Sequence, residues 1–308
     1  MKKCALHSLG CKVNSYETQA MQKMMESAGY EIVPFGEEIA DIYIINTCSV
    51  TNIADRKSRQ MIHKAKKLNP EAVVAAAGCY VESAGDNIDE DVDIVIGNNE
   101  KSHLIEILNE YFEHMDKEKS VDIGKATDFD ELNIDSPLEH TRAYVKIQDG
   151  CNRFCSYCII PYVRGRIRSR KPDDVMAEIK RVAASGCKEV VLTGIHLSSY
   201  GLDFKDSTVK LIDVIEAVNR IEGIERIRLG SLEPLIVTEE FVRRLAKCKK
   251  ICPHFHLSLQ SGCDETLKRM NRRYNVDEYY KGVELLREYF PDAAGATDVI
   301  LGFSGGTG

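Results

Sequence analysis

The chain has 308 residues, of which 44% are hydrophobic and 29% are charged. This composition is typical of a globular protein with two domains, and it argues against a disordered or membrane chain. No apolar run approaches the roughly 18 residues of a membrane helix, and the N-terminus lacks the apolar stretch of a secretory signal. We therefore expect a cytoplasmic protein. Its net charge of −7 argues only weakly against nucleic-acid binding, because basic residues cluster locally.

The first part of the chain alternates short apolar runs, typical of buried strands, with helical patterns. Strands are predicted at residues 4–9, 40–46, 72–77 and 93–96, and helices at residues 15–28, 54–68 and 101–114. Such alternation predicts an α/β fold with helices on both faces of an open parallel sheet, a flavodoxin-like arrangement. We assign this domain to residues 1–115.

Residues 116–140 are polar, acidic and weakly periodic, so we predict a linker there. A second alternating series occupies residues 141–308. Its predicted strands are residues 143–148, 189–193, 226–229, 254–259 and 297–301, and its helices include residues 172–184 and 209–221. This spacing is typical of a βα barrel or partial barrel.

The strongest motif is the loop Cys151-x3-Cys155-x2-Cys158, which directly follows the predicted strand 143–148. Clustered cysteines in a chain without a secretory signal are more often metal ligands or catalytic groups than disulfides. Three thiolates in one loop can bind three irons of a cubane cluster and leave the fourth iron open to another ligand. The alternatives are a zinc site, for which a fourth ligand is missing from the loop, and three unrelated thiols.

Three further cysteines, Cys11, Cys48 and Cys79, each come just after a predicted strand of the first domain. The carboxyl ends of parallel strands share one edge, where ligands bind. Gly10 and Gly78 precede two of these cysteines and allow close packing of the backbone. The pattern predicts a second cluster with an open iron, although a single cysteine of this kind would simply be a small buried residue.

The C-x3-C-x2-C spacing, with Tyr157 just before the third cysteine, resembles the signature of radical S-adenosylmethionine (SAM) enzymes. The resemblance implies that the unique iron of a [4Fe–4S] cluster binds the amino and carboxylate groups of SAM. One electron then cleaves SAM to a radical that abstracts hydrogen from an inert C–H bond. The cofactor carries this chemistry, while the protein positions it and excludes water.

The two cysteine triplets together resemble those of the methylthiotransferase family, and the resemblance extends over the whole chain. It includes Gly194-Ile195-His196, Ser231-Leu232-Glu233-Pro234 and the segment from His256 to Gly262. It implies SAM and two [4Fe–4S] clusters, held by Cys11, Cys48 and Cys79 and by Cys151, Cys155 and Cys158. In this family the second cluster supplies or relays the sulfur that is methylated. The implied reductant is a protein such as flavodoxin or ferredoxin.

The family has three branches, which act on isopentenyladenosine in tRNA, on threonylcarbamoyladenosine in tRNA, or on an aspartate of a ribosomal protein. Residues 9–14 (Leu-Gly-Cys-Lys-Val-Asn) resemble the threonylcarbamoyl branch. The implied reaction replaces the C2–H of N6-threonylcarbamoyladenosine, at position 37 in the anticodon loop, with C2–S–CH3. A non-catalytic iron–sulfur remnant and a different radical enzyme with an auxiliary cluster are the alternatives.

A basic run follows the cysteine loop, where it could bind the phosphates of RNA. It consists of Arg164, Arg166, Arg168, Arg170 and Lys171. The alternative is a solvated loop. By resemblance, the SAM-binding residues are Tyr157, Thr193, Gly194, Ser231, Glu233 and Gln260. Each of these could instead be an ordinary polar residue at a strand end.

Family members usually continue beyond the motif Gly-Phe-Pro-Gly-Glu-Thr, whereas this sequence reads Gly302-Phe303-Ser304-Gly305-Gly306-Thr307-Gly308 and stops. The resemblance implies an incomplete radical SAM partial (βα)6 TIM-like barrel and an absent C-terminal TRAM domain, which grips RNA. We expect an exposed barrel edge and weakened tRNA binding. The sequence predicts no oligomeric state.

Overall fold

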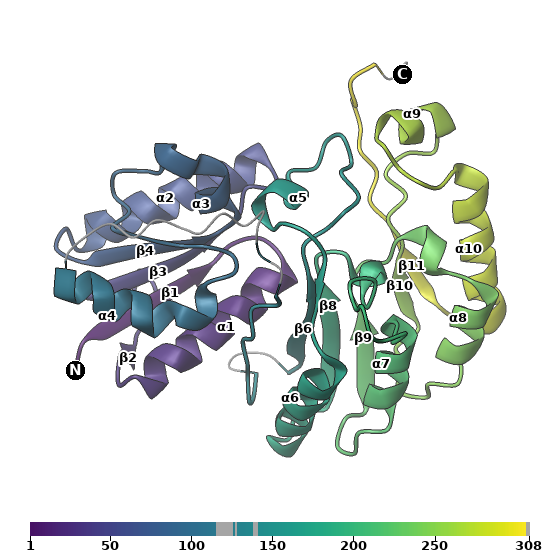
Figure 1. The fold of residues 1–308 in the computed structure, drawn as a ribbon, viewed down its shortest axis with the longest axis horizontal. Coiled ribbons are helices and arrows are strands. Elements are labelled where there is room, and N and C mark those ends of the chain that lie inside the picture. The colour runs from purple at the N-terminus through teal and green to yellow at the C-terminus, as the bar shows by residue number, and fades with distance from the viewer. Residues whose placement is uncertain (115–125, 127, 138–140, 306–308) are drawn as a thin grey trace. The chain divides into compact units, whose positions relative to one another are not determined.

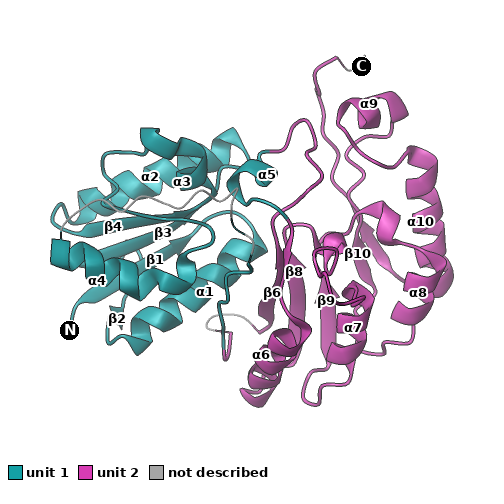
Figure 2. Ribbon diagram, in the orientation of Figure 1, with its two compact units in different colours: residues 1–134, 159–166 teal, residues 135–158, 167–308 magenta. Residues whose placement is uncertain are grey.

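The computed structural model describes residues 1–114, 126, 128–137 and 141–305. The chain divides into two compact units, shown in Figure 2: unit 1 comprises residues 1–134 and 159–166, and unit 2 comprises residues 135–158 and 167–308. Unit 1 is therefore discontinuous in sequence, because the chain returns to it directly after Cys158. Among the described helices, none has the length and apolar character needed to span a membrane.

Unit 1 contains a parallel five-stranded sheet with the order β2-β1-β3-β4-β5 (Figure 1). Its strands are β1 (Lys3–Ser8), β2 (Glu31–Ile32), β3 (Ile42–Thr47), β4 (Val73–Gly78) and β5 (Ile94–Ile96). Its helices are α1 (Lys12–Ser27), α2 (Asn52–Leu68), α3 (Cys79–Ala84), α4 (Leu104–His114) and α5 (Ile160–Val163). The sheet confirms the predicted open parallel fold.

The two faces of this sheet are buried under different helices (Figure 1). On β3, Ile42 and Ile44 pack in a core with residues of α1 and α4. Tyr43 and Ile45 point the other way, into a core with residues of α2 and α3. Both faces of the central strands are covered, which is why these strands appear in the sequence as continuous apolar runs.

Unit 2 contains a four-stranded sheet, β7-β6-β8-β9, and a two-stranded sheet, β10-β11. Its strands are β6 (Ala143–Asp149), β7 (Arg168–Ser169), β8 (Glu189–Gly194), β9 (Arg226–Leu229), β10 (His254–His256) and β11 (Ala294–Ala296). Its helices are α6 (Pro172–Ala184), α7 (Leu211–Asn219), α8 (Glu239–Leu245), α9 (Asp264–Arg269) and α10 (Val276–Tyr289). Apart from antiparallel β7, all pairs are parallel, and the helices alternate with the strands as in a partial βα barrel.

The last predicted strand of unit 2 is misplaced. The segment 297–301 contributes only an isolated bridge between Val299 and Gln260, and the strand β11 is formed by the small residues just before it. The chain leaves the regular strand path at Gln260, whose φ is +66°. Residues 294–296 form the strand because they pair with β10, although the segment after them has the higher β-propensity.

Part of the predicted linker belongs to unit 1. Residues 115–125, 127 and 138–140 lie outside the described residues, but Leu132 and Ile134 are buried, each at 2% exposure. The hydroxyl of Tyr16 on α1 donates a hydrogen bond to the carbonyl of Leu132. Leu132 and Ile134 therefore contribute to the core of unit 1.

Two glycines permit close contacts at the strand ends of unit 1. Gly78 has φ +96° and ψ −162°, and a Cβ there would lie 2.4 Å from the carbonyl oxygen of Thr47. Gly10 has φ +95°, and a Cβ there would lie 2.8 Å from the sulfur of Cys48. These contacts bring β4 and β1 close to the end of β3.

The substitution Gly78→Ala should lower the free energy of unfolding by at least about 2 kcal/mol, because backbone strain and a clash with backbone act together. Gly29→Ala is the matched control, since Gly29 has φ +87° but no atom within 4 Å of its added Cβ. It should cost about 1 kcal/mol. Urea denaturation followed by circular dichroism measures both, and equal losses would contradict the steric argument.

Candidate functional site

The three cysteines of unit 1 follow three adjacent parallel strands. Cys11 is the N-cap of α1 after β1, Cys48 comes directly after β3, and Cys79 opens α3 after β4. Because β1, β3 and β4 are neighbours in the sheet, their carboxyl ends meet at one edge. Cys48 and Cys79 are buried, at 6% and 3% exposure, whereas Cys11 is exposed. The result is a thiol site that is buried on one side and open on the other.

The sulfurs of this site are close enough to influence one another. Burial raises the pKa of both Cys48 and Cys79, and the neighbouring Cys11 thiol raises each further. The positive charge of Arg164 opposes this effect at both cysteines. The site thus combines three interacting thiols with one nearby cation.

No cysteine triplet among the described residues has the close spacing of a compact single-metal site. No three cysteine sulfurs among the described residues lie within 4.8 Å of one another. A tetrahedral zinc ion with Zn–S distances of about 2.3 Å would need its sulfurs about 3.8 Å apart. A cubane cluster binds each thiolate to a different iron and so requires wider spacing. Three cysteine thiols are a donor set that fits three irons of a cubane cluster.

The second cysteine triplet lies in the loop after β6 in unit 2. Cys151 and Cys155 are each 8% exposed, and Cys158 is half-buried. Burial raises the pKa of Cys151 to about 11, and the backbone amide of Arg153, which donates to its sulfur at 3.4 Å, opposes this shift. Charge interactions with Cys155 and Cys158 raise the same pKa, so these three thiols also interact.

The segment after α9 fixes this loop. The side-chain amide of Asn271 donates to the carbonyl of Phe154 at 2.9 Å, and the backbone amide of Ser156 donates to the carbonyl of Met270 at 3.1 Å. Phe154 has φ +49°, a conformation that needs such outside support. The loop is therefore held in shape by contacts from residues more than a hundred positions away.

Two arginines that the motif analysis did not single out contact the second triplet. Arg272 donates a hydrogen bond to the sulfur of Cys155 at 3.2 Å. Arg153 forms an ion pair with Glu233, which also lies 3.6 Å from the ring nitrogen Nε2 of His196. Burial favours protonation of Glu233, but the nearby ring of His196 and the guanidinium of Arg153 lower its pKa overall. A buried carboxylate is thus held beside the cysteine loop.

The residues assigned to SAM binding occupy the strand ends of unit 2. Thr193 and Gly194 end β8, and Glu233 is 4% exposed. A Cβ at Gly194 would lie 2.9 Å from the Cβ of Gln148, whose side-chain oxygen accepts from the amide of His196 at 2.6 Å. The remaining assigned residues are exposed or partly exposed; they are Tyr157, Ser231 and Gln260. Their contacts with SAM stay predictions.

Three of the five residues predicted to contact RNA are buried, which does not favour phosphate contact at these positions. Arg164, Arg168 and Arg170 have exposed fractions of 0%, 1% and 0%. Their respective ion-pair partners are Glu17, Asp149 and Glu178. A buried, paired guanidinium cannot reach a phosphate. Arg166 and Lys171 are exposed and keep their predicted role.

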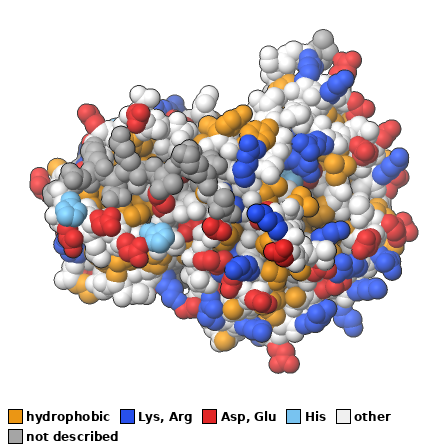
Figure 3. All heavy atoms as spheres, viewed as in Figure 1, with side chains coloured by type: hydrophobic (Ala, Val, Ile, Leu, Met, Phe, Trp, Pro, Cys, Tyr) orange, Lys and Arg blue, Asp and Glu red, His pale blue; other side chains and the backbone are white. Residues whose placement is uncertain are grey.

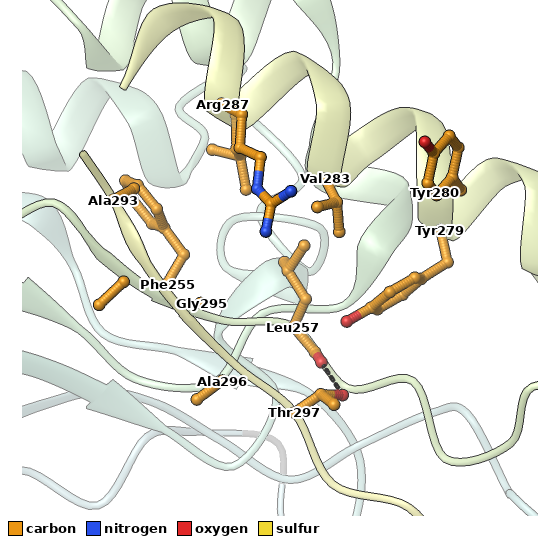
Figure 4. Close-up of a pocket in the computed structure, with 12 residues that line it drawn as sticks. Phe255, Leu257, Tyr279, Tyr280, Val283, Arg287, Ala293, Gly295, Ala296 and Thr297 are labelled. Carbon is orange, nitrogen blue, oxygen red and sulfur yellow. Dashed lines mark hydrogen bonds between the residues drawn. The ribbon is translucent and has the colours of Figure 1, made fainter. Parts of the chain in front are cut away.

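A cavity of about 260 Å³ lies between β10, β11 and α10, and no cysteine lines it. Figure 4 shows that it is lined mainly by apolar side chains such as Phe255, Leu257 and Val283, with Arg287 above them. The hydroxyl of Thr297 at its rim donates to the carbonyl of Leu257 at 2.5 Å. No predicted site residue lines this cavity.

Comparison with protein families gives two matches. The Radical SAM superfamily matches residues 145–307, and a family described as Uncharacterized protein family UPF0004 matches residues 3–97. The first match covers the cysteine loop of unit 2 and implies a [4Fe–4S] cluster and SAM. The second covers the three cysteines of unit 1.

Solved structures share the fold at low sequence identity. The radical SAM methyltransferase TsrM from Kitasatospora setae has a TM-score of 0.68 and 14% identity, over 100% of this chain and 69% of its own. The cobalamin-dependent SAM radical enzyme OxsB has a TM-score of 0.66 and 11% identity, over 98% of this chain and 49% of its own. At this identity the likeness shows the fold alone.

Curated relatives are similar over nearly the whole chain. Threonylcarbamoyladenosine tRNA methylthiotransferase MtaB of Bacillus subtilis is 41% identical over 100% of this chain and 68% of its own length. The same-named protein of Aquifex aeolicus is 42% identical over 98% and 73%. A tRNA-2-methylthio-N(6)-dimethylallyladenosine synthase of Clostridium botulinum is 35% identical over 98% and 68%. The chain therefore belongs to the methylthiotransferase family of radical SAM enzymes.

Proposed function

We propose that this chain methylthiolates N6-threonylcarbamoyladenosine in tRNA, with SAM and two [4Fe–4S] clusters. The observation that carries the substrate is the 36–42% identity to four relatives named for that nucleoside. The dimethylallyladenosine synthases are slightly less similar, at 35–36% identity. The Leu-Gly-Cys-Lys-Val-Asn motif at residues 9–14 supports the same branch.

The two cysteine triplets have different roles in this proposal. The triplet in unit 2 would hold the cluster that binds SAM, and the triplet in unit 1 would hold a second cluster. Together with an electron from a flavodoxin or ferredoxin, these groups supply reductive cleavage of SAM, hydrogen abstraction from adenine C2 and the sulfur to be transferred. The half-open site formed by Cys11, Cys48 and Cys79 suits the second cluster, because a small sulfur species can reach it from solvent.

The protein's own residues preorganise the site in unit 2. Asn271 and Ser156 fix the cysteine loop before any ligand binds. Arg272 donates a hydrogen bond to the sulfur of Cys155 and so fixes the orientation of this thiol in the loop. Glu233, ionised and held by Arg153 and His196, can accept hydrogen bonds from the hydroxyls of a ribose.

A tRNA substrate needs local positive charge, since the chain as a whole is acidic. Figure 3 shows Lys and Arg intermixed with Asp and Glu on the drawn face of unit 2, without a broad field of one sign. Arg166 and Lys171 are the exposed members of the basic run that we propose for phosphate contact. We expect this reaction on tRNA to take place in the cytoplasm.

Iron analysis after anaerobic reconstitution tests the two clusters. The unaltered chain should bind about eight irons and release 5′-deoxyadenosine upon reduction with SAM. Replacing Cys11, Cys48 and Cys79 with Ala should leave about four irons and retain SAM cleavage. Replacing Cys151, Cys155 and Cys158 should also leave about four but abolish cleavage. Cys263→Ala is the control. Eight irons in either triple variant would refute this assignment.

Mass spectrometry of tRNA tests the substrate. Purified tRNAs that carry either threonylcarbamoyladenosine or isopentenyladenosine are incubated separately with the reconstituted chain, SAM, sulfide and reductant. We expect the methylthio product only from the threonylcarbamoyl tRNA. Product from the isopentenyl tRNA alone would assign the chain to the other tRNA branch. SAM cleavage without product from either tRNA would favour a different radical enzyme, and no cleavage at all would favour a non-catalytic remnant.

Binding of tRNA as a function of salt tests the phosphate contacts. The double substitution of Arg166 and Lys171 to Gln should weaken binding and reduce the salt slope by about 1.4, or about 0.7 per lost contact with a single strand. Arg181→Gln is the control, because Arg181 is an exposed arginine paired with Asp135. If the control and the double variant have the same salt slope, the two residues do not contact phosphate.

A further inference from the structure

The segment 159–166 begins directly after Cys158 but is part of unit 1. Its helix α5 packs against α3, the helix that opens with Cys79. The side-chain amide of Asn98 donates to the carbonyl of Val163 at 2.7 Å. The backbone amide of Arg164 donates to the carbonyl of Ile160 at 2.8 Å and ends α5. The backbone that carries Arg164 is therefore fixed within unit 1.

The guanidinium of Arg164 is fully buried, and both of its terminal nitrogens donate hydrogen bonds. Its Nη1 donates to Glu17 Oε1 at 2.7 Å, and its Nη2 donates to Asn14 Oδ1 at 2.6 Å and to Glu17 Oε2 at 3.1 Å. Glu17 and Asn14 are themselves buried, at 0% and 1% exposure. This planar, bidentate arrangement suits arginine and not lysine. The orientation of the guanidinium is thus defined by α1.

The same guanidinium reaches the thiol site. Its charge acts on the thiols of Cys79 and Cys48, and its helix α5 packs against α3, which opens with Cys79. Its partner Asn14 accepts a weak hydrogen bond from the sulfur of Cys11 at 3.9 Å. Arg164 is therefore connected to each of the three thiols, directly or through one side chain.

Arg164 and a second cation flank the same buried carboxylate. Glu17 lies between Arg164 and Lys101, and the Lys101 Nζ is 2.9 Å from Glu17 Oε2. A cubane of core charge +2 with three thiolates carries about −1, and about −2 after reduction. A guanidinium beside such a cluster would stabilise the reduced form more than the oxidised form.

We propose that Arg164 is a positioning residue for the second cluster: its hydrogen bonds to Asn14 and Glu17 hold a buried positive charge beside the ligands, which favours the reduced state. The inference rests on the proposed cluster at Cys11, Cys48 and Cys79. It assigns a role in unit 1 to a residue of the basic run that follows the cysteine loop of unit 2. A purely structural ion pair with Glu17 is the competing explanation.

The test uses the full chain in which Cys151, Cys155 and Cys158 are replaced with Ala, so that only the second cluster forms. Iron content, the electron paramagnetic resonance spectrum after reduction and the midpoint potential are measured. Arg164→Met should shift the potential downward and lower the iron content, and Glu17→Gln should shift the potential upward. Arg164→Lys, which keeps the charge, should shift the potential less than Arg164→Met. Arg59→Met, the removal of an exposed arginine paired with Asp55, is the control and should shift nothing.

The opposite signs separate the two explanations, because loss of a structural ion pair would destabilise both variants alike. Thermal unfolding of the metal-free proteins monitors that loss. If the potential is unchanged in the Arg164 and Glu17 variants, or shifts in the same direction in both, the inference fails. If Arg164→Met does not fold, Arg164→Lys and Glu17→Gln decide the result by the same criterion. If the parent protein with only Cys11, Cys48 and Cys79 binds no iron, the proposed second cluster itself fails.

Discussion

Parallel pairing of β1, β3 and β4 is the constraint on which the site in unit 1 depends. Ser8 pairs with Asn46, and Asn46 pairs with Ala77, so the three strands end in register. Each cysteine then follows within three residues of that line. A slip of one strand by two residues would move one thiol away from the others by about 7 Å, at about 3.3 Å per residue. Convergence of the thiols is thus a property of the sheet as a whole.

The site in unit 2 is organised differently. Its three cysteines are close in sequence, so the loop needs no sheet register to gather them. The fold adds a fixed loop conformation, through the hydrogen bond from Asn271, and two charged side chains, Arg272 and Glu233, that distant parts of the chain bring to the loop. Preorganisation of this kind places the ligands before binding and reduces the entropy lost when a ligand binds.

The sequence predicts the two groups of cysteines, the alternation of strands and helices, and the parallel sheet. These features depend on local composition and on the rule that the carboxyl ends of parallel strands share one edge. It does not predict that Arg164, Arg168 and Arg170 of the basic run are buried. Glu17, the partner of Arg164, lies 147 positions away on α1. Arg272, the partner of Cys155, lies 117 positions away. Short elements such as β2, α3, α5 and β7 were also not predicted, because none is long enough to show a period.

The discontinuity of unit 1 has a consequence for protein synthesis. The strands and helices of residues 1–134 leave the ribosome first, but the arginine that balances Glu17 follows only after the cysteine loop. Until then Glu17 lacks its ion pair with Arg164, and α3 has no α5 against it. The nascent chain thus completes the interior of its first unit only while the second is being made. A fragment cut at Ile134 would lack this arginine and would be a poor substitute for the intact unit.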